Sequence, residues 1–255
     1  MKVRELYARL NEKIPPSLSC SWDNDGLMCA PDPEAEVKRV LVALDITAAV
    51  VREATLGGFD LIVSHHPLIF APLRALDPAD PVAKKVIALL RAGVAAMSFH
   101  TRLDAVKGGV NDVLAEALGL CDVVPFGPEG EAIGRIGSLE KPTTLGEFAM
   151  KVKSVTRADC VQFTDAGRTV RRVAVLGGSG SSDVAAAERA GADTYVTGEL
   201  KHNNLTDAPE RGMNLVAAGH FYTENLICER IRELLLEIDG TLSVVVVNSN
   251  PVCVL

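Results

Sequence analysis

The five histidines of this 255-residue chain all follow segments whose pattern predicts buried strands. Two of them stand side by side after the run LIVS, and the others follow VAAMS, DTYVTGEL and NLVAAG. In chain order they are His65, His66, His100, His202 and His220. Ligands of open parallel sheets bind beyond the carboxyl ends of the strands. The placement therefore predicts a binding site at such an edge.

A carboxylate stands four residues after two of these histidines. Asp104 follows His100 and Glu224 follows His220 at this spacing. On a helix, side chains at i and i+4 project from one face, so His220 and Glu224 can contact one ion. One such pair alone is more often a solvated pair, and one histidine at a strand end is more often a hydrogen-bonded residue. Their coincidence at several strand ends favours a metal site.

The adjacent His65 and His66 bear on the number of ions. Their side chains diverge from an extended backbone, which suits two neighbouring ions better than one. Imidazole with carboxylate favours zinc, manganese or iron as the divalent metal. The six cysteines are scattered without a CxxC pair, which argues against a structural thiolate site. The five candidate ligands are His65, His66, Asp104, His220 and Glu224. Five ligands for two ions leave coordination positions open, as a hydrolytic site requires.

Two further residues and one loop are candidates for a supporting role. His100 could be a proton donor or could orient a metal ligand, and Asp45, which ends another strand, could orient a ligand histidine or a water. For both, orientation is favoured over direct catalysis. The run LGGSGSSD, residues 176–183, could cradle a phosphate at a helix N-terminus. It lacks the dinucleotide spacing, so a tight turn is the favoured interpretation.

The scaffold that positions these residues is predicted from the alternation of helix and strand signals. It indicates an α/β fold of two lobes with mainly parallel sheets, and the metal site at strand carboxyl ends. The stretch 123–143, rich in glycine and proline, is predicted to cross between lobes. Residues 1–122 with 215–255 are predicted to form the metal-binding lobe, and 123–214 the second. One long helix is predicted over residues 221–238.

Composition narrows the class of partner. A hydrophobic fraction of 48% and a charged fraction of 23% are typical of a soluble globular protein. Residues 1–16 contain no signal-peptide core, and no apolar run approaches the roughly 18 residues of a membrane helix. A net charge of −7 argues against nucleic acid. We expect a cytoplasmic protein with reduced thiols that acts on a small molecule.

Eight ordered motifs run along nearly the whole chain. They are WDNDGL (22–27), ALDIT (43–47), SHHPLIF (64–70), HTRLD (100–104), GGVND (108–112), GRIG (134–137), GADTYVTGEL (191–200) and GHFYTEN (219–225). On these motifs the chain resembles the dinuclear-metal-centre proteins of the NIF-three-like family, which are often named type 2 GTP cyclohydrolase I. So many motifs in one order make the match specific.

The resemblance implies a ligand set, an architecture and an assembly. The implied ligands of the two ions are His65, His66, Asp104, His220 and Glu224. The implied architecture is two interlinked α/β lobes with the metal site between the lobes, and the implied assembly is a toroidal homohexamer. One departure is Asn203, which stands where relatives often show a second histidine after His202. It speaks against a chemical role for that loop.

The leading hypothesis is a dinuclear metal-dependent hydrolase. The family naming suggests hydrolytic opening of the guanine ring of GTP, with a nucleotide as the small-molecule substrate. No nucleotide-specific motif is present, and a phosphoesterase or another amidohydrolase fits the same residues. The competing class is a non-enzymatic metal-binding or interaction protein. Open coordination positions favour the enzyme.

Overall fold

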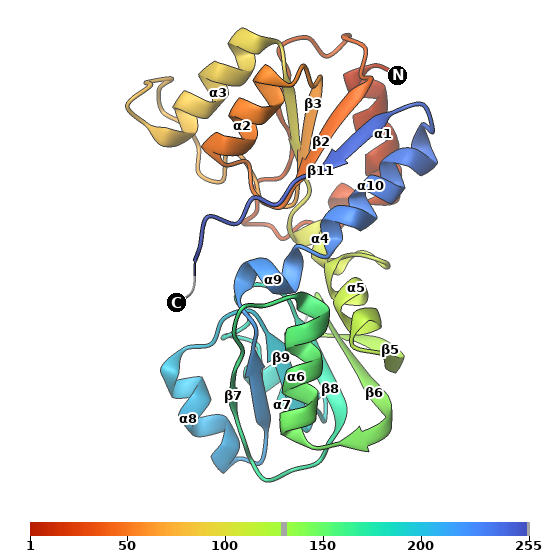
Figure 1. Ribbon diagram of the computed structural model, residues 1–255, viewed down its shortest axis with the longest axis vertical. Coiled ribbons are helices and arrows are strands. Elements are labelled where there is room, and N and C mark those ends of the chain that lie inside the picture. The colour runs from red at the N-terminus through yellow and green to blue at the C-terminus, as the bar shows by residue number, and fades with distance from the viewer. Residues whose placement is uncertain (129–131, 254–255) are drawn as a thin grey trace. The chain divides into compact units, whose positions relative to one another are not determined.

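The computed structural model describes residues 1–128 and 132–253, which form an α/β protein with two sheets (Figure 1). The chain divides into two compact units. Unit 1 consists of Met1–Val106 and Ile227–Pro251, and unit 2 contains Lys107–Leu226. Each unit holds one of the sheets. The predicted α/β class is therefore confirmed.

Unit 1 has a five-stranded sheet in the order β1-β4-β3-β2-β11. Its strands are β1 (Gly26–Cys29), β2 (Arg39–Ala43), β3 (Leu61–Ser64), β4 (Ala95–Ser98) and β11 (Ser243–Val246). All neighbours are parallel except β1, which pairs antiparallel with β4. Strands β3 and β4 are buried throughout, as expected for parallel strands covered on both faces. The helices are α1 (Val3–Lys13), η1 (Pro16–Leu18), α2 (Ala48–Leu56), α3 (Pro81–Ala92), α4 (Thr101–Ala105) and α10 (Ile227–Ile238).

Unit 2 has a six-stranded sheet in the order β5-β6-β8-β9-β10-β7. Its strands are β5 (Leu120–Phe126), β6 (Gly134–Thr143), β7 (Gln162–Thr164), β8 (Val170–Leu176), β9 (Thr194–Thr197) and β10 (Asn214–Ala217). Strands β8, β9 and β10 form a parallel centre, and antiparallel strands flank it on both sides. The sheet is thus mixed. The helices are α5 (Val110–Ala117), α6 (Leu145–Thr156), α7 (Val184–Arg189), α8 (His202–Glu210) and α9 (His220–Glu224).

Local capping explains why several helices begin and end where the sequence predicts. The Thr47 side chain accepts the Val50 amide at the start of α2. Asp80 caps α3 in the same way, and Gly93 ends α3 in the left-handed conformation. Thr144 opens α6 with a capping box. Within residues 1–128 and 132–253, no helix is long and apolar enough to cross a membrane.

The prediction that residues 123–143 cross between the lobes is wrong. These residues lie mainly in an antiparallel pair of strands. Strands β5 and β6 pair within unit 2, and residues 129–131 of the stretch lie outside the described residues. A Cβ on Gly134 would lie 2.3 Å from the Phe126 ring, and one on Gly137 would lie 2.8 Å from the Cys121 carbonyl oxygen. These glycines allow close strand approach. In the sequence alone, glycines so closely spaced indicate a linker.

The prediction of one long helix over residues 221–238 is also wrong, because this segment forms two helices. Helix α9 ends at Glu224 and α10 begins at Ile227. The two pack on different cores, since α9 contacts α5 whereas α10 contacts α1, β2 and β11. The chain passes between the units here and again near Val106. Residues 107–122 and 215–226 consequently belong to unit 2, whereas the sequence assigned them to the metal-binding lobe.

Gly134→Ala is expected to lower the free energy of unfolding by about 1–3 kcal/mol, as overpacking of a buried site does. The added methyl would meet the ring of Phe126, which is 5% exposed and packs against Tyr195. Gly146→Ala in α6 is the matched control, because nothing lies within 4 Å of its Cβ position. It should stabilise by about 0.5–1 kcal/mol. Urea denaturation compares the two, and equal effects would contradict the packing argument.

Candidate metal centre

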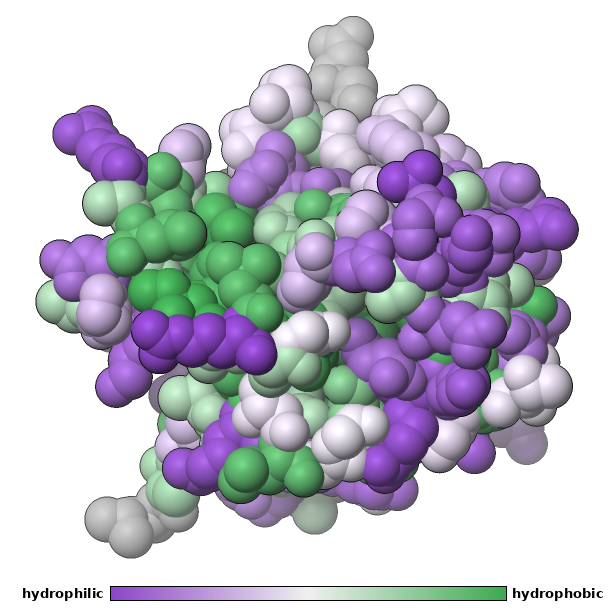
Figure 2. Space-filling model, turned by 90° about the horizontal axis from the view of Figure 1, so that it is seen from above, coloured by the Kyte–Doolittle hydropathy of each residue, from purple (hydrophilic) through white to green (hydrophobic). Residues whose placement is uncertain are grey.

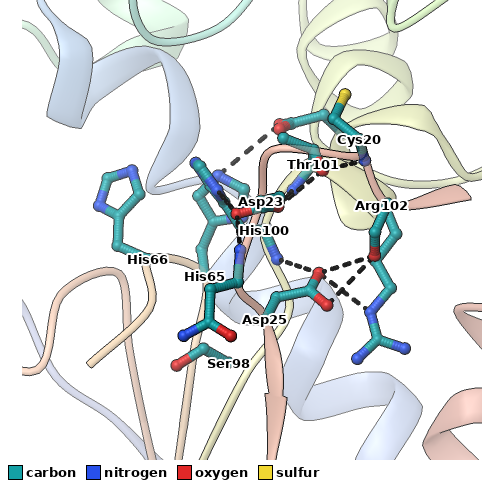
Figure 3. A network of polar contacts seen from close by, with 12 residues as sticks. Cys20, Asp23, Asp25, His65, His66, Ser98, His100, Thr101 and Arg102 are labelled. Atoms are coloured by element: carbon teal, nitrogen blue, oxygen red, sulfur yellow. Dashed lines mark hydrogen bonds and ion pairs between the residues drawn. The ribbon is translucent and has the colours of Figure 1, made fainter. Parts of the chain in front are cut away.

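Three histidines of unit 1 come together beyond the carboxyl ends of two neighbouring strands. His65 and His66 follow β3, and His100 follows β4 (Figure 3). Strands β3 and β4 are parallel and in register at Ser64 and Ser98, so the residues after them meet. One ring nitrogen of each histidine lies within 4.8 Å of the others. The ring centroids are 4.9, 5.3 and 5.7 Å apart.

The rings of His65 and His66 are oriented by oxygen acceptors. His65 Nδ1 lies 2.9 Å from the Phe99 carbonyl oxygen, and His66 Nδ1 lies 2.7 Å from Asp45 Oδ1. Carbonyl and carboxylate oxygens only accept, so each Nδ1 carries the hydrogen. Nε2 is then the nitrogen whose lone pair can reach an ion, the arrangement usual in metal-binding histidines. Asp45 therefore orients His66, a candidate ligand.

His100 is held in the same way by a buried carboxylate. Its Nδ1 lies 2.8 Å from Asp23 Oδ1, and the backbone amide and hydroxyl of Thr101 donate to Asp23 Oδ2 at 3.0 and 2.6 Å (Figure 3). Burial alone would raise the pKa of the Asp23 carboxyl, but the hydrogen bonds from His100 and Thr101 hold that pKa below its usual value. Asp23 thus stays charged and fixes the imidazole.

A second carboxylate anchors the loop that supplies Asp23. Asp25 Oδ2 accepts Arg102 Nε at 3.0 Å and the His100 amide at 3.2 Å. Arg102 is 1% exposed, donates to Asn11 and lies over the Phe99 ring. The sequence prediction missed Asp23 and Asp25 as site residues. Two aspartates in a short loop that ends at a glycine were the available signal.

Asp104 brings a carboxylate to the histidines of unit 1. It stands in α4, the helix that follows β4, and its Oδ1 lies 3.6 Å from His65 Nε2. His65 is fully buried and Asp104 is partly buried. The pair offers one nitrogen and one oxygen ligand to a common ion.

Unit 2 carries the predicted histidine–glutamate pair on α9. His220 Nε2 lies 3.1 Å from Glu224 Oε2 at the i, i+4 spacing, and His220 Nδ1 lies 3.4 Å from Glu199 Oε1. The helix begins directly after β10 and Gly219, whose φ is 86°. Glu224 is buried and His220 is half-buried. The pair therefore presents its two polar atoms at a strand end, as predicted.

The run 176–183 supports this pair and is not built as a phosphate cradle. Three of its amides donate to side-chain oxygens of neighbouring elements. They are those of Gly177, Gly178 and Gly180, which donate to Asn111, Thr223 and Thr197 at 2.8, 3.0 and 3.0 Å. A Cβ on Gly178 would lie 2.1 Å from Glu224 Oε1 and 3.0 Å from His220 Nε2. The favoured tight-turn interpretation agrees with these contacts.

His202, the fifth histidine, is set apart from the others. It is exposed and is the first residue of α8. In the part of the chain that the structure describes, it belongs to none of the histidine, cysteine and acidic groups that could hold an ion. Substitution of His202 is therefore a control for substitutions of the candidate metal ligands.

The family described as Duf34/NIF3 (NGG1p interacting factor 3) matches residues 1–251. The chain belongs to the Duf34/NIF3 family. A protein of Clostridium perfringens named GTP cyclohydrolase 1 type 2 homolog is 32% identical over 243 residues, which cover 93% of this chain and 92% of that protein. One of the same name from Nostoc sp. is 35% identical over 240 residues, covering 92% and 91%. The resemblance predicted from the motifs is confirmed.

A solved structure extends the match to three dimensions. The crystal structure of Staphylococcus aureus protein SA1388 is similar with a TM-score of 0.89 and 27% identity, covering 100% of this chain and 99% of that one. In this Duf34/NIF3 chain, the five predicted ligands are divided between the units. His65, His66 and Asp104 belong to unit 1, and His220 and Glu224 belong to unit 2.

Proposed function

We propose that this Duf34/NIF3 protein is a metal-dependent hydrolase that binds two divalent ions. The proposed ligands are His65, His66, Asp104, His220 and Glu224. The observation that carries the proposal is the orientation of His65 and His66, whose Nδ1 atoms are engaged by a carbonyl and a carboxylate. Nitrogen and carboxylate donors without cysteine suit zinc, manganese or iron.

The chemistry follows from these residues. Ions held by this set would supply Lewis-acid polarisation of the bond under attack and a water of lowered pKa. Asp45 holds the His66 ring, and Asp23 holds the His100 ring. His100 stands in the same cluster as the ligand histidines and would hold or deliver a proton at Nε2.

The proposed substrate is a nucleotide, and the proposed reaction is hydrolytic ring opening. Support comes from the relatives named GTP cyclohydrolase 1 type 2 homolog. The experiment is turnover of GTP, other nucleotides and phosphoesters by the purified protein, with and without added zinc, manganese or iron. Metal-dependent release of formate from GTP would support ring opening. Release of phosphate instead would indicate a phosphoesterase, and no turnover by protein that holds two ions would indicate a non-enzymatic metal protein.

We also propose that the protein is a cytoplasmic homo-oligomer, a ring of six by its family resemblance. Unit 1 exposes an apolar groove of about 690 Å³ between α2 and α3, lined by residues that include Val51, Leu56, Ala79 and Ala88. Apolar residues gather on this part of the surface (green, left in Figure 2). Exposed apolar patches commonly mark interaction sites. Light scattering that finds a stable monomer at micromolar concentration would contradict the assembly.

Gly178→Ala is expected to reduce the bound metal, because the new methyl would displace the Glu224 carboxylate. Gly167→Ala is the matched control. Both glycines have φ near 70°, at 68° and 71°, so both variants carry similar backbone strain, but nothing lies within 4 Å of the Gly167 Cβ position. Elemental analysis after dialysis should find fewer ions in Gly178→Ala only. Equal metal contents would mean that Glu224 does not need its present position.

A further inference from the structure

Two large aromatic side chains lie exposed beside the three histidines of unit 1. Trp22 is 58% exposed and Phe70 is 54% exposed. Their ring centroids lie 6.3 Å apart, and each lies 6.2 Å from the His100 ring, in edge-to-face geometry. Trp22 is the chain's single tryptophan, in a protein with only 4% aromatic residues. We name Trp22 and Phe70 the aromatic pair.

Hydrogen bonds fix the two loops that carry the aromatic pair. The Asn24 side chain donates to the Ile69 carbonyl oxygen, which ties the loop before β1 to the loop after β3. Asp23, next to Trp22, accepts two hydrogen bonds from Thr101. The rings therefore stand on anchored backbone, so a ligand that binds them meets a preorganised surface.

The chemistry of this surface favours a flat ring that can bind through its face. Scattered exposed apolar residues are normal in proteins, but Trp22 and Phe70 both lie edge-to-face against one imidazole and against each other. Such rings bind planar ring systems by stacking. Neither side chain carries a charge that could pair with a phosphate, and the one donor that they offer is the indole Nε1–H of Trp22. The aromatic pair also adjoins His100, whose own ring is part of the candidate metal centre.

We propose that the aromatic pair binds the planar heteroaromatic ring of the substrate, a purine or a ring of similar size, and holds it beside His100. That the bound molecule is a substrate rests on the proposed function. The binding of the ring is independent of that function, because stacking on Trp22 and Phe70 requires neither hydrolysis nor a particular metal. The reacting part of the substrate would then be this ring, and not a phosphoester group.

The single tryptophan provides a direct test on the full-length protein as purified. Guanosine is titrated while Trp22 fluorescence is excited at the red edge of its absorption. A saturable change is expected, whereas ribose 5-phosphate at the same concentrations should leave the signal unchanged. Phe70→Ala should weaken guanosine binding by roughly tenfold, as removal of a stacking side chain does. Phe163→Ala is the matched control, because Phe163 is 49% exposed and lies in β7 of unit 2.

The proposal would be overturned by the absence of a saturable response to guanosine, by an equal response to ribose 5-phosphate, or by equal weakening in Phe70→Ala and Phe163→Ala. A half-saturation that shifts with protein concentration would also overturn it, since it would indicate burial of Trp22 by self-association. The titration involves no turnover. Its failure would leave hydrolysis to be judged by the turnover panel, and an inactive protein that still binds guanosine would contradict only the proposed function.

Discussion

The His66→Ala protein is expected to fold normally but to lose at least one of its two proposed ions. The His66 side chain is 23% exposed and Asp45, its partner, is 37% exposed, so water can replace the lost contact at little cost in stability. Loss of a residue that only orients a ligand typically weakens metal binding by roughly 10–100-fold. Loss of the ligand itself should weaken metal binding by more than this. Elemental analysis after dialysis measures the metal, and thermal unfolding of chelator-treated protein checks the fold.

The same experiment on a ligand of unit 2 tests whether donors of both units are needed. Glu224→Gln keeps the size of the side chain but removes its charge, and we expect it to lose metal as His66→Ala does. His202→Ala is the matched control, because His202 is exposed and outside the candidate centre. If only one of the first two variants loses metal, the ligand set is wrong in the unit that tolerates its change. If His202→Ala loses metal too, the assay does not report on the site.

The parallel strands and most helices could be predicted because their signals are local. A buried run such as residues 61–64 is apolar at every position before its serine, and Asp80 with Gly93 marks both ends of α3. The meeting of His65 and His100 followed from one topological rule, since parallel neighbours end at one edge. That rule needs no knowledge of side-chain packing.

The errors arose where tertiary packing decides the structure. Gly134 and Gly137 suggested a linker, but they permit close pairing of β5 with β6, which becomes visible only when Phe126 and Cys121 are in place. The split between α9 and α10 has the same origin. Helical periodicity continues through residues 220–238, yet the two halves pack on different cores.

The residues that surround His100 could not be predicted from the sequence either. Asp23 reaches His100 across 77 residues of chain, and Trp22 and Phe70 meet through two loops whose conformations no periodicity describes. The sequence held only a partial signal, since the single tryptophan is followed closely by the two aspartates Asp23 and Asp25. Only the fold shows that these side chains surround one imidazole.

A comparison of His100→Ala with Asp104→Ala separates a proton-transfer residue from a ligand. His100→Ala is expected to keep both ions and to lose most of the activity, about 10–100-fold, because Asp23 holds this ring beside the ligand histidines. Asp104→Ala should instead lose at least one ion. A carboxylate close to two cations offsets their mutual repulsion, and its removal leaves that repulsion uncompensated.

Metal content and turnover of the two variants, measured side by side, decide between the roles. His100→Gln extends the comparison, because it keeps a polar side chain next to Asp23 but cannot transfer a proton, so it should be as inactive as His100→Ala. Recovery of activity in His100→Gln would mean that the contact with Asp23 matters and proton transfer does not. If His100→Ala loses an ion while Asp104→Ala keeps both, His100 is the ligand, and the roles proposed for residues 100–104 must be exchanged.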